Sequence, residues 1–359
     1  MKRPRRRKSV HPAHGRSLRA AAALLRRGDL VAFPTETVYG LGANALDAKA
    51  VAKIFAAKGR PQDNPLIVHV SDLKMLRKVA KAPSPRARAL LARFWPGPLT
   101  LILSKKSSVP ALVTAGLDTV AVRMPQGLAR SLVRLAGVPV AAPSANVSGR
   151  PSPTTARHVA DDLPGVFVLD GGPTKHGLES TVIALKPHPV VLRHGALTEE
   201  ELRVLLPSLQ GAPSSHRPRP DRGNVVFSSK VNRRRRAGAA GARGLPNRAS
   251  AAAASPGTNY KHYAPARSLI LFLRRSSLLS YFRRHPSALV LCPARLSPLF
   301  PKQRFLSLGS STEEIARNLF AALRTRRRGT ELLALAIPRR GVGRAVMDRL
   351  MRAATRIVR

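Results

Sequence analysis

The sequence predicts an α/β protein with two domains, of which the second is the smaller. The chain has 359 residues, which is enough for two hydrophobic cores. Short apolar runs of strand length alternate with amphipathic stretches of helix length, the pattern of a sheet covered by helices. This pattern disappears between residues 210 and 254 and then resumes, which predicts a linker between two domains.

Helix and strand signals follow one another through the first domain. Asp47 is an expected N-cap, Gly28 an expected helix terminator, and Thr198 with Glu201 forms an expected capping box. The expected helices are residues 17–27, 48–57, 73–79, 85–94, 128–136 and 198–206. The expected strands are residues 30–33, 66–68, 99–103, 119–123, 139–142, 166–169, 181–185 and 190–193. Residues 143–153 are too rich in Pro, Ser and Gly for regular structure, so we expect a polar loop there.

The second domain is expected to form a small, mostly parallel sheet. Its expected strands are residues 269–273, 288–292 and 332–337, and its expected helices are residues 277–284, 313–325 and 344–354. The predicted division is a basic disordered N-terminus at residues 1–14, a first domain at 15–209, a linker at 210–265 and a second domain at 266–359. The linker is rich in Arg, Ala, Gly and Pro and ends in SPGTNYKHYAP.

Positive charge dominates the composition, with a formal net charge of +45. Residues 2–8 read KRPRRRK, and between residues 212 and 250 ten Lys and Arg face one acid, Asp221. Such runs are usually disordered and favour non-specific, salt-sensitive contact with RNA. Arginine is also abundant on the ordinary expected helices, which favours a skewed overall composition instead.

Cysteine and apolar content bound the cellular setting. Cys292 is the single cysteine, so a disulfide framework and a thiolate metal site are excluded and a reducing cytoplasm is expected. No apolar run approaches the length of a membrane span. No hydrophobic core of signal-peptide length follows the basic N-terminus, because His11, His14, Arg16 and Arg19 interrupt it.

Two cations, Lys58 and Arg60, are expected just past the end of a helix. Pro61 and Pro65 stiffen the loop that carries them into a buried strand. Fixed cations on such a loop are well placed to hold an anionic ligand, although the local pattern also fits a solvated helix end. Further polar positions follow apolar strands, where α/β folds place ligands. They are residues 35–37, His69, residues 119–123, residues 144–146, Ser180 and Arg193.

Each of these polar positions also has an ordinary structural interpretation. His69 fits a core histidine, Ser144 and Asn146 fit turn formers, and Arg193 fits a surface charge. The chain has no GxxxxGK[ST] loop, no GxGxxG after a strand, and no HExxH or CxxC motif. Together the polar positions supply cations, hydroxyls and an amide but no covalent nucleophile. This set suits a phosphorylated nucleotide and a small polar substrate, with catalysis by positioning and charge stabilisation.

Six ordered motifs carry a resemblance to a known family. They are PTETVYGLG at 34–42, KGRPQDNPL at 58–66, FWPGPLTLIL at 94–103, VAVRMP at 120–125, APSANVSGRPSPT at 142–154 and GLESTVI at 177–183. Over residues 15–206 the chain resembles the YrdC/Sua5 family of threonylcarbamoyl-adenylate synthases. SPGTNYKHYAP resembles the interdomain motif of the two-domain Sua5 form, and residues 266–359 resemble its accessory domain.

The resemblance implies a fold and a reaction. It implies a YrdC-like twisted α/β sheet around a positive concave pocket, followed by a Rossmann-like C-terminal domain. It also implies a nucleotidyltransferase that converts L-threonine, bicarbonate and ATP into threonylcarbamoyl-adenylate and pyrophosphate. The threonylcarbamoyl group then passes, through TsaD-type partner proteins, to adenosine 37 of tRNAs that read ANN codons (t6A modification). Mg²⁺ is expected to accompany ATP without a dedicated protein metal site.

The resemblance also implies roles for residues that match the family motifs. Lys58 and Arg60 match the basic pair expected to neutralise charge at the α-phosphorus and on pyrophosphate. The expected L-threonine-binding residues are Thr37, His69, Arg123, Ala142 and Ser180. The expected ATP-binding residues are Arg60, Asn64, Thr119, Ser144, Asn146, Ser152, Arg193, Tyr260 and Tyr263.

Two features depart from the family pattern. Thr258 stands where the family usually has Met, and the basic stretch 212–250 lengthens the connector. Tyr260 or Tyr263 is expected to cover the site and exclude water.

Two other functions are weighed against this one. A non-catalytic module that binds double-stranded RNA has no need for the lid motif, and a hydrogenase-maturation carbamoyl-transfer protein carries CxxC motifs that a chain with one cysteine cannot supply.

Overall fold

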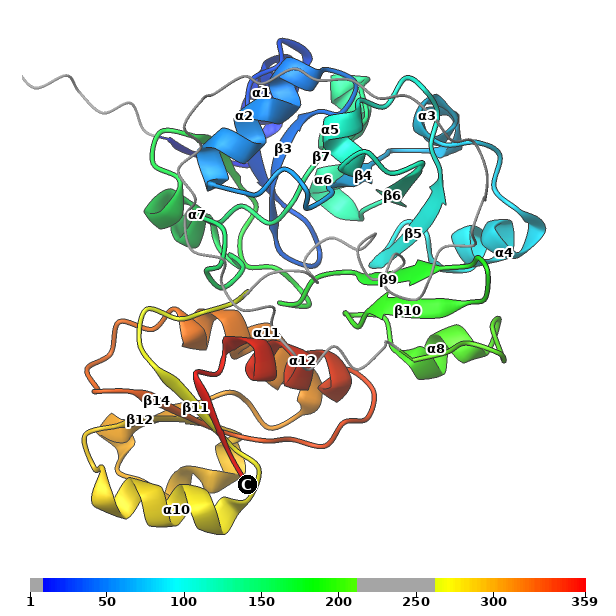
Figure 1. Cartoon of the computed structure of the whole chain (residues 1–359). Coiled ribbons are helices and arrows are strands. Elements are labelled where there is room, and N and C mark those ends of the chain that lie inside the picture. The colour runs from blue at the N-terminus through cyan, green and yellow to red at the C-terminus, as the bar shows by residue number, and fades with distance from the viewer. Residues whose placement is uncertain (1–8, 212–261) are drawn as a thin grey trace, which may run out of the picture.

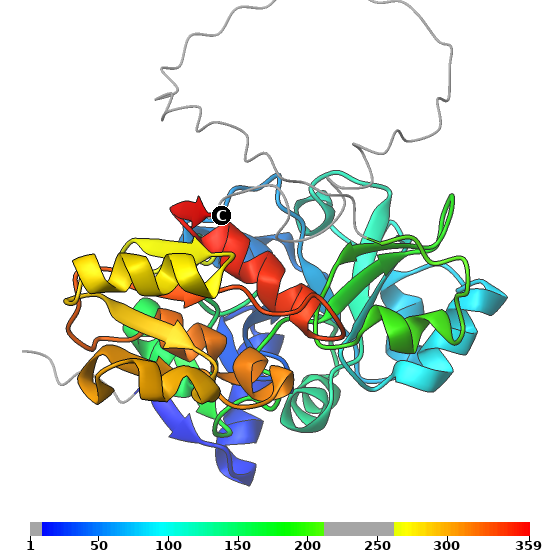
Figure 2. The same cartoon turned by 90° about the horizontal axis from the view of Figure 1, so that it is seen from below.

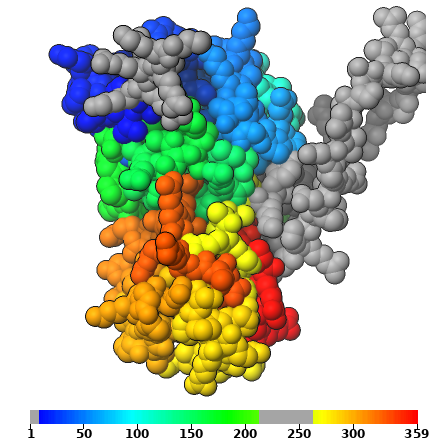
Figure 3. All heavy atoms as spheres, turned by 90° about the vertical axis from the view of Figure 1, so that its left-hand side faces the viewer, coloured from blue at the N-terminus to red at the C-terminus, as the bar shows by residue number. Residues whose placement is uncertain are grey.

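The computed structural model describes residues 9–211 and 262–359, which form two domains in contact. In Figure 1 the first domain runs from blue to green and the second from yellow to red. Figure 3 shows the two domains stacked on each other as separate lobes. Within the described residues, no helix has the length and apolar character needed to cross a membrane.

The first domain is built on a mixed sheet that has ten strands within residues 9–211. Their order is β1-β8-β2-β3-β7-β4-β6-β5-β9-β10. The strands are β1 (Val10–Pro12), β2 (Val31–Pro34), β3 (Tyr39–Asn44), β4 (Ile67–His69), β5 (Leu99–Ser104), β6 (Thr119–Arg123), β7 (Val140–Ala141), β8 (Phe167–Asp170), β9 (Thr181–Ala184) and β10 (Val190–Arg193). Strands β4 and β6 run parallel, with His69 opposite Arg123 at their carboxyl ends. These two polar residues are therefore neighbours at the carboxyl ends of two central strands.

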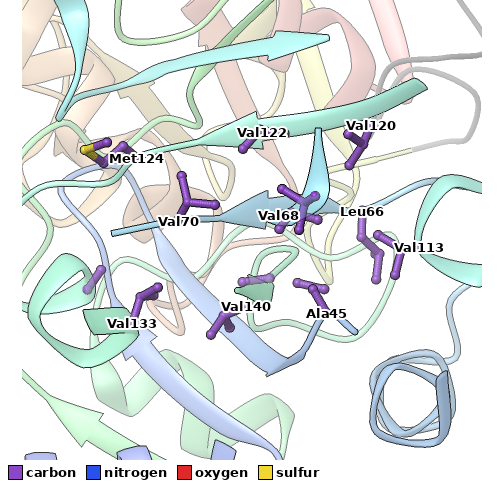
Figure 4. Packing of buried hydrophobic residues seen from close by; sticks show 14 of the residues in the cluster. Ala45, Leu66, Val68, Val70, Val113, Val120, Val122, Met124, Val133 and Val140 are labelled. Carbon is purple, nitrogen blue, oxygen red and sulfur yellow. The ribbon is translucent and has the colours of Figure 1, made fainter. Parts of the chain in front are cut away.

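Helices cover this sheet and complete its core. They are α1 (Gly15–Arg26), α2 (Ala48–Lys58), α3 (Leu73–Val79), α4 (Pro85–Phe94), α5 (Ala111–Thr114), α6 (Gly127–Ala136), α7 (Ala156–Asp162) and α8 (Glu199–Arg203). Val68, Val122 and Val140, from β4, β6 and β7, are fully buried and pack in one cluster (Figure 4). Full burial of such a side chain contributes on the order of 1.5 kcal/mol, so this cluster fixes the strands that end at the site.

Several expected elements have the predicted bounds, and others were missed. Helices α3 and α4 and strand β6 match, because Asp72 and Ser84 cap the two helices as ordinary N-caps. Strand β3 was not expected, because glycines interrupt its apolar pattern. A Cβ on Gly42 would lie 2.6 Å from the Phe33 ring, so close packing requires glycine there. Helices α5 and α7 and strand β1 were also missed. Strand β1 lies inside residues 1–14, which were predicted to be disordered, and it pairs with β8.

The second domain contains a five-stranded sheet in the order β13-β12-β14-β11-β15, and each neighbouring pair is parallel. Its strands are β11 (Leu269–Phe272), β12 (Leu289–Cys292), β13 (Phe305–Ser307), β14 (Leu332–Leu335) and β15 (Arg356–Val358). Its helices are α10 (Arg275–Arg284), α11 (Thr312–Leu323) and α12 (Gly343–Ala353), with short 3₁₀ turns at Ala294–Leu299 and Lys302–Arg304. The predicted parallel sheet is confirmed.

Helices α11 and α12 lie between the second sheet and the first domain, and α10 lies on the other face (Figure 1). Val38 and Leu178 of the first domain belong to the same buried cluster as Phe320 and Val346 of these helices. Figure 2 shows α12, in red, running toward the green hairpin β9–β10. The domains therefore share a buried apolar interface. Most of the predicted linker, residues 212–261, lies outside the described residues.

Candidate active site

A cavity lies where the carboxyl ends of β4 and β6 meet the loop at residues 143–153 and the domain interface. It encloses about 750 Å³ of space between atoms, counted out to the solvent at its mouth. Twelve of the predicted site residues line it: Thr37, Lys58, Arg60, His69, Arg123, Ala142, Ser144, Asn146, Ser152, Ser180, Arg193 and Tyr263.

Three predicted site residues are not part of this lining. Asn64 is buried behind Arg60. Thr119 lies at the opposite end of β6 from Arg123, four residues away, which is about 13 Å along a strand. Tyr260 lies outside the described residues. Apart from these three positions, the residues predicted to bind L-threonine and those predicted to bind ATP line the same cavity.

Lys58 is the last residue of α2, not a residue past its end as expected, and the left-handed Gly59 ends the helix behind it. Its side chain is 1% exposed. Its ammonium donates to the carbonyl of Ser144 at 2.6 Å and to the carbonyl of Asn146. Burial and the neighbouring Arg60 hold the pKa of Lys58 well below its usual value, so an anion at this position would favour the charged form.

Asn64 holds Arg60 in place. The Arg60 guanidinium donates to the Asn64 side-chain oxygen at 2.7 Å and to the carbonyls of Asn64 and Pro65 at 3.1 and 2.9 Å. These contacts turn the loop after α2 into a rigid support for a cation. Asn64 was predicted to line the nucleotide. In this structure it accepts hydrogen bonds from Arg60.

Arg123 is buried and lies between three partners. Its Nε donates to the carbonyl of Gly97 at 3.1 Å, its Nη1 to the Thr37 hydroxyl at 2.8 Å, and its Nη2 lies 2.7 Å from a carboxylate oxygen of Glu36. A guanidinium has five N–H groups, so these contacts leave one on each Nη for a carboxylate ligand. The sequence reasoning missed Glu36. Its signal was an acid inside the otherwise uncharged motif PTETVYGLG.

His69 is buried beside Arg123 and faces the cavity. Burial and the charge of Arg123 lower its pKa to about 3, so the imidazole is neutral at pH 7. Its Nδ1 has no hydrogen-bond partner among residues 9–211 and 262–359. A neutral imidazole with an unsatisfied nitrogen suits hydrogen bonding to a small polar ligand.

Ser180 and Arg193 form an adjoining part of the wall. The Ser180 hydroxyl lies 2.7 Å from that of Thr100, and Arg193 donates to the Ser180 hydroxyl at 3.2 Å and to its carbonyl at 3.1 Å. Arg193 is buried, so the surface-charge interpretation of this residue is wrong. Burial lowers the pKa of Arg193 below its usual value, and the negative charge of Glu179 only partly offsets this effect.

Ser152 is held by an acid that the sequence reasoning also missed. Its hydroxyl donates to Oε1 of Glu179 at 2.6 Å. The other oxygen of Glu179 accepts from Arg349, which belongs to the second domain. Tyr263 completes this side: the Arg349 guanidinium lies 5.7 Å from the centre of its ring, and burial raises the pKa of Tyr263 to about 12. His262 also lines the cavity, with its pKa lowered to about 3 by burial.

Positive charge dominates the cavity. Its lining includes five basic side chains, Lys58, Arg60, Arg123, Arg150 and Arg193, and one carboxylate, Glu179, among the described residues. Within the same residues, no group of three or more His, Cys, Asp or Glu could hold a metal ion. The arrangement can bind a polyanion and a carboxylate side by side.

Two family models match the chain. The Sua5/YciO/YrdC model, described by the term telomere recombination, matches residues 23–195. The model of the threonylcarbamoyl-AMP synthase C-terminal domain matches residues 223–355.

Similar proteins extend over almost the whole chain. A threonylcarbamoyl-AMP synthase of Pyrococcus abyssi is 43% identical, with 94% of this chain and 93% of the relative covered. The Bacillus subtilis and Schizosaccharomyces pombe proteins of that name are 41% and 37% identical, covering 93% and 97% of this chain and 92% and 90% of their own lengths. The crystal structure of P. abyssi Sua5 complexed with L-threonine has a TM-score of 0.80 at 40% identity, covering 97% of this chain and 98% of that one. Because the two family models match in order and these relatives, 37–43% identical, cover more than nine tenths of the chain, the chain belongs to the two-domain Sua5 family of threonylcarbamoyl-AMP synthases.

Proposed function

We propose that this protein is an L-threonylcarbamoyladenylate synthase, which joins L-threonine, bicarbonate and ATP and releases pyrophosphate. The observation that carries the proposal is a single cavity that combines a buried arginine, Arg123, with the cation pair Lys58 and Arg60. A cavity that holds both kinds of group can bind a carboxylate substrate and a triphosphate with their reacting atoms close together. The relatives named above support the same reaction.

L-threonine is assigned to the part of the cavity around Arg123. The open N–H groups of Arg123 suit the threonine carboxylate in a bidentate contact. Thr37, His69 and Ser180 offer short polar groups for the hydroxyl and the carbamate, and Ala142 adds a small apolar surface for the methyl group. The threonine complex of the P. abyssi protein supports this substrate.

ATP is assigned to the part around Lys58, Arg60, Ser144, Asn146, Ser152 and Arg193. The amine of threonine first adds to the carbon of bicarbonate, with loss of water, to form a carbamate. A carbamate oxygen then attacks the α-phosphorus, and the bond to pyrophosphate breaks. The nucleophile belongs to the substrate, so the protein supplies orientation and charge stabilisation by Lys58 and Arg60.

Mg²⁺ is proposed to enter with ATP and to neutralise phosphate charge. The lining carboxylate Glu179 is already ion-paired with Arg349, which fits a metal carried by the triphosphate better than a protein metal site. Transfer of the product to tRNA is proposed to need TsaD-type partner proteins. The basic segments proposed to touch RNA, residues 2–8 and 212–250, lie outside the described residues.

The test follows pyrophosphate release by the purified full chain with ATP·Mg²⁺. We expect release that requires both L-threonine and bicarbonate. Release without threonine dependence, together with tight, salt-sensitive binding of double-stranded RNA, would overturn the proposal and support the non-catalytic RNA-binding module.

A further inference from the structure

Arg349, on α12 of the second domain, is fully buried and aimed at the first domain. Its Nε and Nη2 donate to Oε2 of Glu179 at 3.1 and 3.0 Å, and its Nη1 donates to the carbonyl of His194 at 2.6 Å. Asp348 lies 3.0 Å from the same Nη1. A buried cation is costly unless it is paired in good geometry, and here three of its donor groups are directed across the domain interface.

The contact continues to the cavity through Glu179. Its Oε1 accepts the hydrogen of the Ser152 hydroxyl at 2.6 Å, and Ser152 lines the cavity. Burial alone would raise the pKa of Glu179, but Arg349, Arg193 and the Ser152 hydrogen bond outweigh it and hold the pKa below the usual value. Glu179 is therefore an ionised acceptor. Because the hydroxyl hydrogen points toward Glu179, the lone pairs of the Ser152 oxygen are available to a ligand.

A second arginine of the same domain holds the residue before Ser152. Arg324, which follows α11, donates through Nε to the carbonyl of Pro151 at 3.0 Å and through Nη2 to Asp162 at 2.6 Å. Arg324 thus contacts Pro151 directly, and Arg349 is connected to Ser152 through Glu179, so two arginines of the second domain act on consecutive residues of the loop that borders the cavity. Because these contacts reach the cavity loop itself, the second domain does more than cover the first.

We propose that Arg349 is a positioning residue for the nucleoside part of ATP: through Glu179 it orients Ser152 so that its oxygen accepts a hydrogen bond from a ribose hydroxyl or the adenine amino group. This inference rests on the proposed function. The phosphate oxygens of ATP are almost entirely deprotonated at neutral pH, so they have no hydrogen to donate to a Ser152 oxygen held in this way.

The experiment compares Arg349→Lys with Arg344→Met in the full chain. Lysine keeps the charge but loses the two-pronged contact with Glu179. Arg344 is a matched control, because it also makes a domain-crossing ion pair, with Glu199 at 2.5 Å, and neither partner lines the cavity. We expect Arg349→Lys to raise KM for ATP roughly fivefold to tenfold while KM for threonine changes less than about twofold. Arg344→Met should leave both KM values within about twofold.

Two further measurements separate positioning from general stability. In a Ser152→Ala background, Arg349→Lys should add less than about twofold to KM for ATP, because both changes act through one hydroxyl. Inhibition by inorganic tripolyphosphate, which has no sugar or base, should be unchanged in Arg349→Lys. If Arg349→Lys does not fold, Glu179→Gln tests the same contact and should raise KM for ATP selectively.

The results that overturn the inference are distinct from those that overturn the proposed function. An unchanged KM for ATP in Arg349→Lys, an effect that multiplies with Ser152→Ala, or an equal weakening of tripolyphosphate would each reject the positioning role while wild-type turnover persists. Loss of threonine dependence in the wild-type chain would instead reject the proposed function.

Discussion

Two buried ion pairs support the cavity wall, and they differ in the origin of their arginines. Glu36 and Arg123 both belong to the first domain, and their nearest charged atoms lie 2.7 Å apart. Glu179 belongs to the first domain, but its partner Arg349, at 3.0 Å, belongs to the second. Each carboxylate also anchors a neighbour: Glu36 accepts from the amide of Gln126, and Glu179 accepts from the hydroxyl of Ser152.

The difference separates the two substrates. The part assigned to threonine is complete within the first domain, since Thr37 and Arg123 bond each other directly. The part assigned to the nucleoside needs the second domain, because Ser152 depends on Glu179 and Glu179 on Arg349. A substitution in the threonine part of the cavity should therefore affect the kinetics of threonine more than those of ATP, and a substitution in the nucleoside part should do the reverse. A substitution between the two parts should affect the reaction of both substrates.

The largest effect is expected between the two sides, at Lys58. We expect Lys58→Met to lower the rate of pyrophosphate release roughly 10²- to 10³-fold, because it removes a charge at the phosphate and also the contacts to Ser144 and Asn146. Lys53→Met is the matched control, since Lys53 lies on the same helix with a 48% exposed side chain that pairs with Asp29. Its rate should stay within about twofold, and near-normal turnover in Lys58→Met would contradict the mechanism.

A smaller and selective effect is expected at Arg123. Arg123→Lys should raise KM for threonine roughly tenfold and KM for ATP less than about threefold, because an ammonium cannot hold Thr37, Glu36 and a substrate carboxylate together. Steady-state kinetics with each substrate varied in turn measure both values. Opposite selectivity in Arg123→Lys and Arg349→Lys would sharpen the division of the cavity, and equal effects on both substrates in both variants would remove it.

The local elements of this site could be predicted from the sequence, but its pairings could not. Caps and apolar periodicity act over a few residues, so β6, α3 and α4 were predicted with the correct bounds. Arg349 and Glu179 are 170 residues apart, and no local pattern records that they meet. Glu36 was missed for the same reason, since it lies in the loop between β2 and β3, and only the completed fold brings this loop to Arg123 on β6. Family motifs recovered twelve of the lining residues, but they did not identify Glu36, Glu179 and Arg349, which hold several of them in place.

Acid should destabilise the protein through a buried histidine on each side of the cavity. Burial lowers the pKa of His69 and of His262 to about 3, below the unfolded value of about 6.5. The folded protein therefore resists protonation of these two residues, which have no effect on stability above about pH 6.5 and lower it progressively below that pH. Between pH 7.5 and pH 5 each histidine lowers the free energy of unfolding by about 2 kcal/mol. Urea unfolding at both pH values should show a loss about 2 kcal/mol smaller in His69→Gln than in the wild type; an identical loss would contradict the assignment.

The smallest effect is expected at Thr119, which matches a family position assigned to ATP but lies outside the cavity lining. It pairs with Ser104 at the start of β6, while Arg123 occupies the end of that strand which meets the site. Valine has the same shape and a high strand propensity, so Thr119→Val should change stability by less than about 0.5 kcal/mol. KM for ATP should stay within about twofold, because no contact with the nucleotide is lost. A rise of tenfold or more would mean that the cavity extends along β6 when ATP binds, and the nucleotide side would then not be confined to the loop that Arg349 and Arg324 hold.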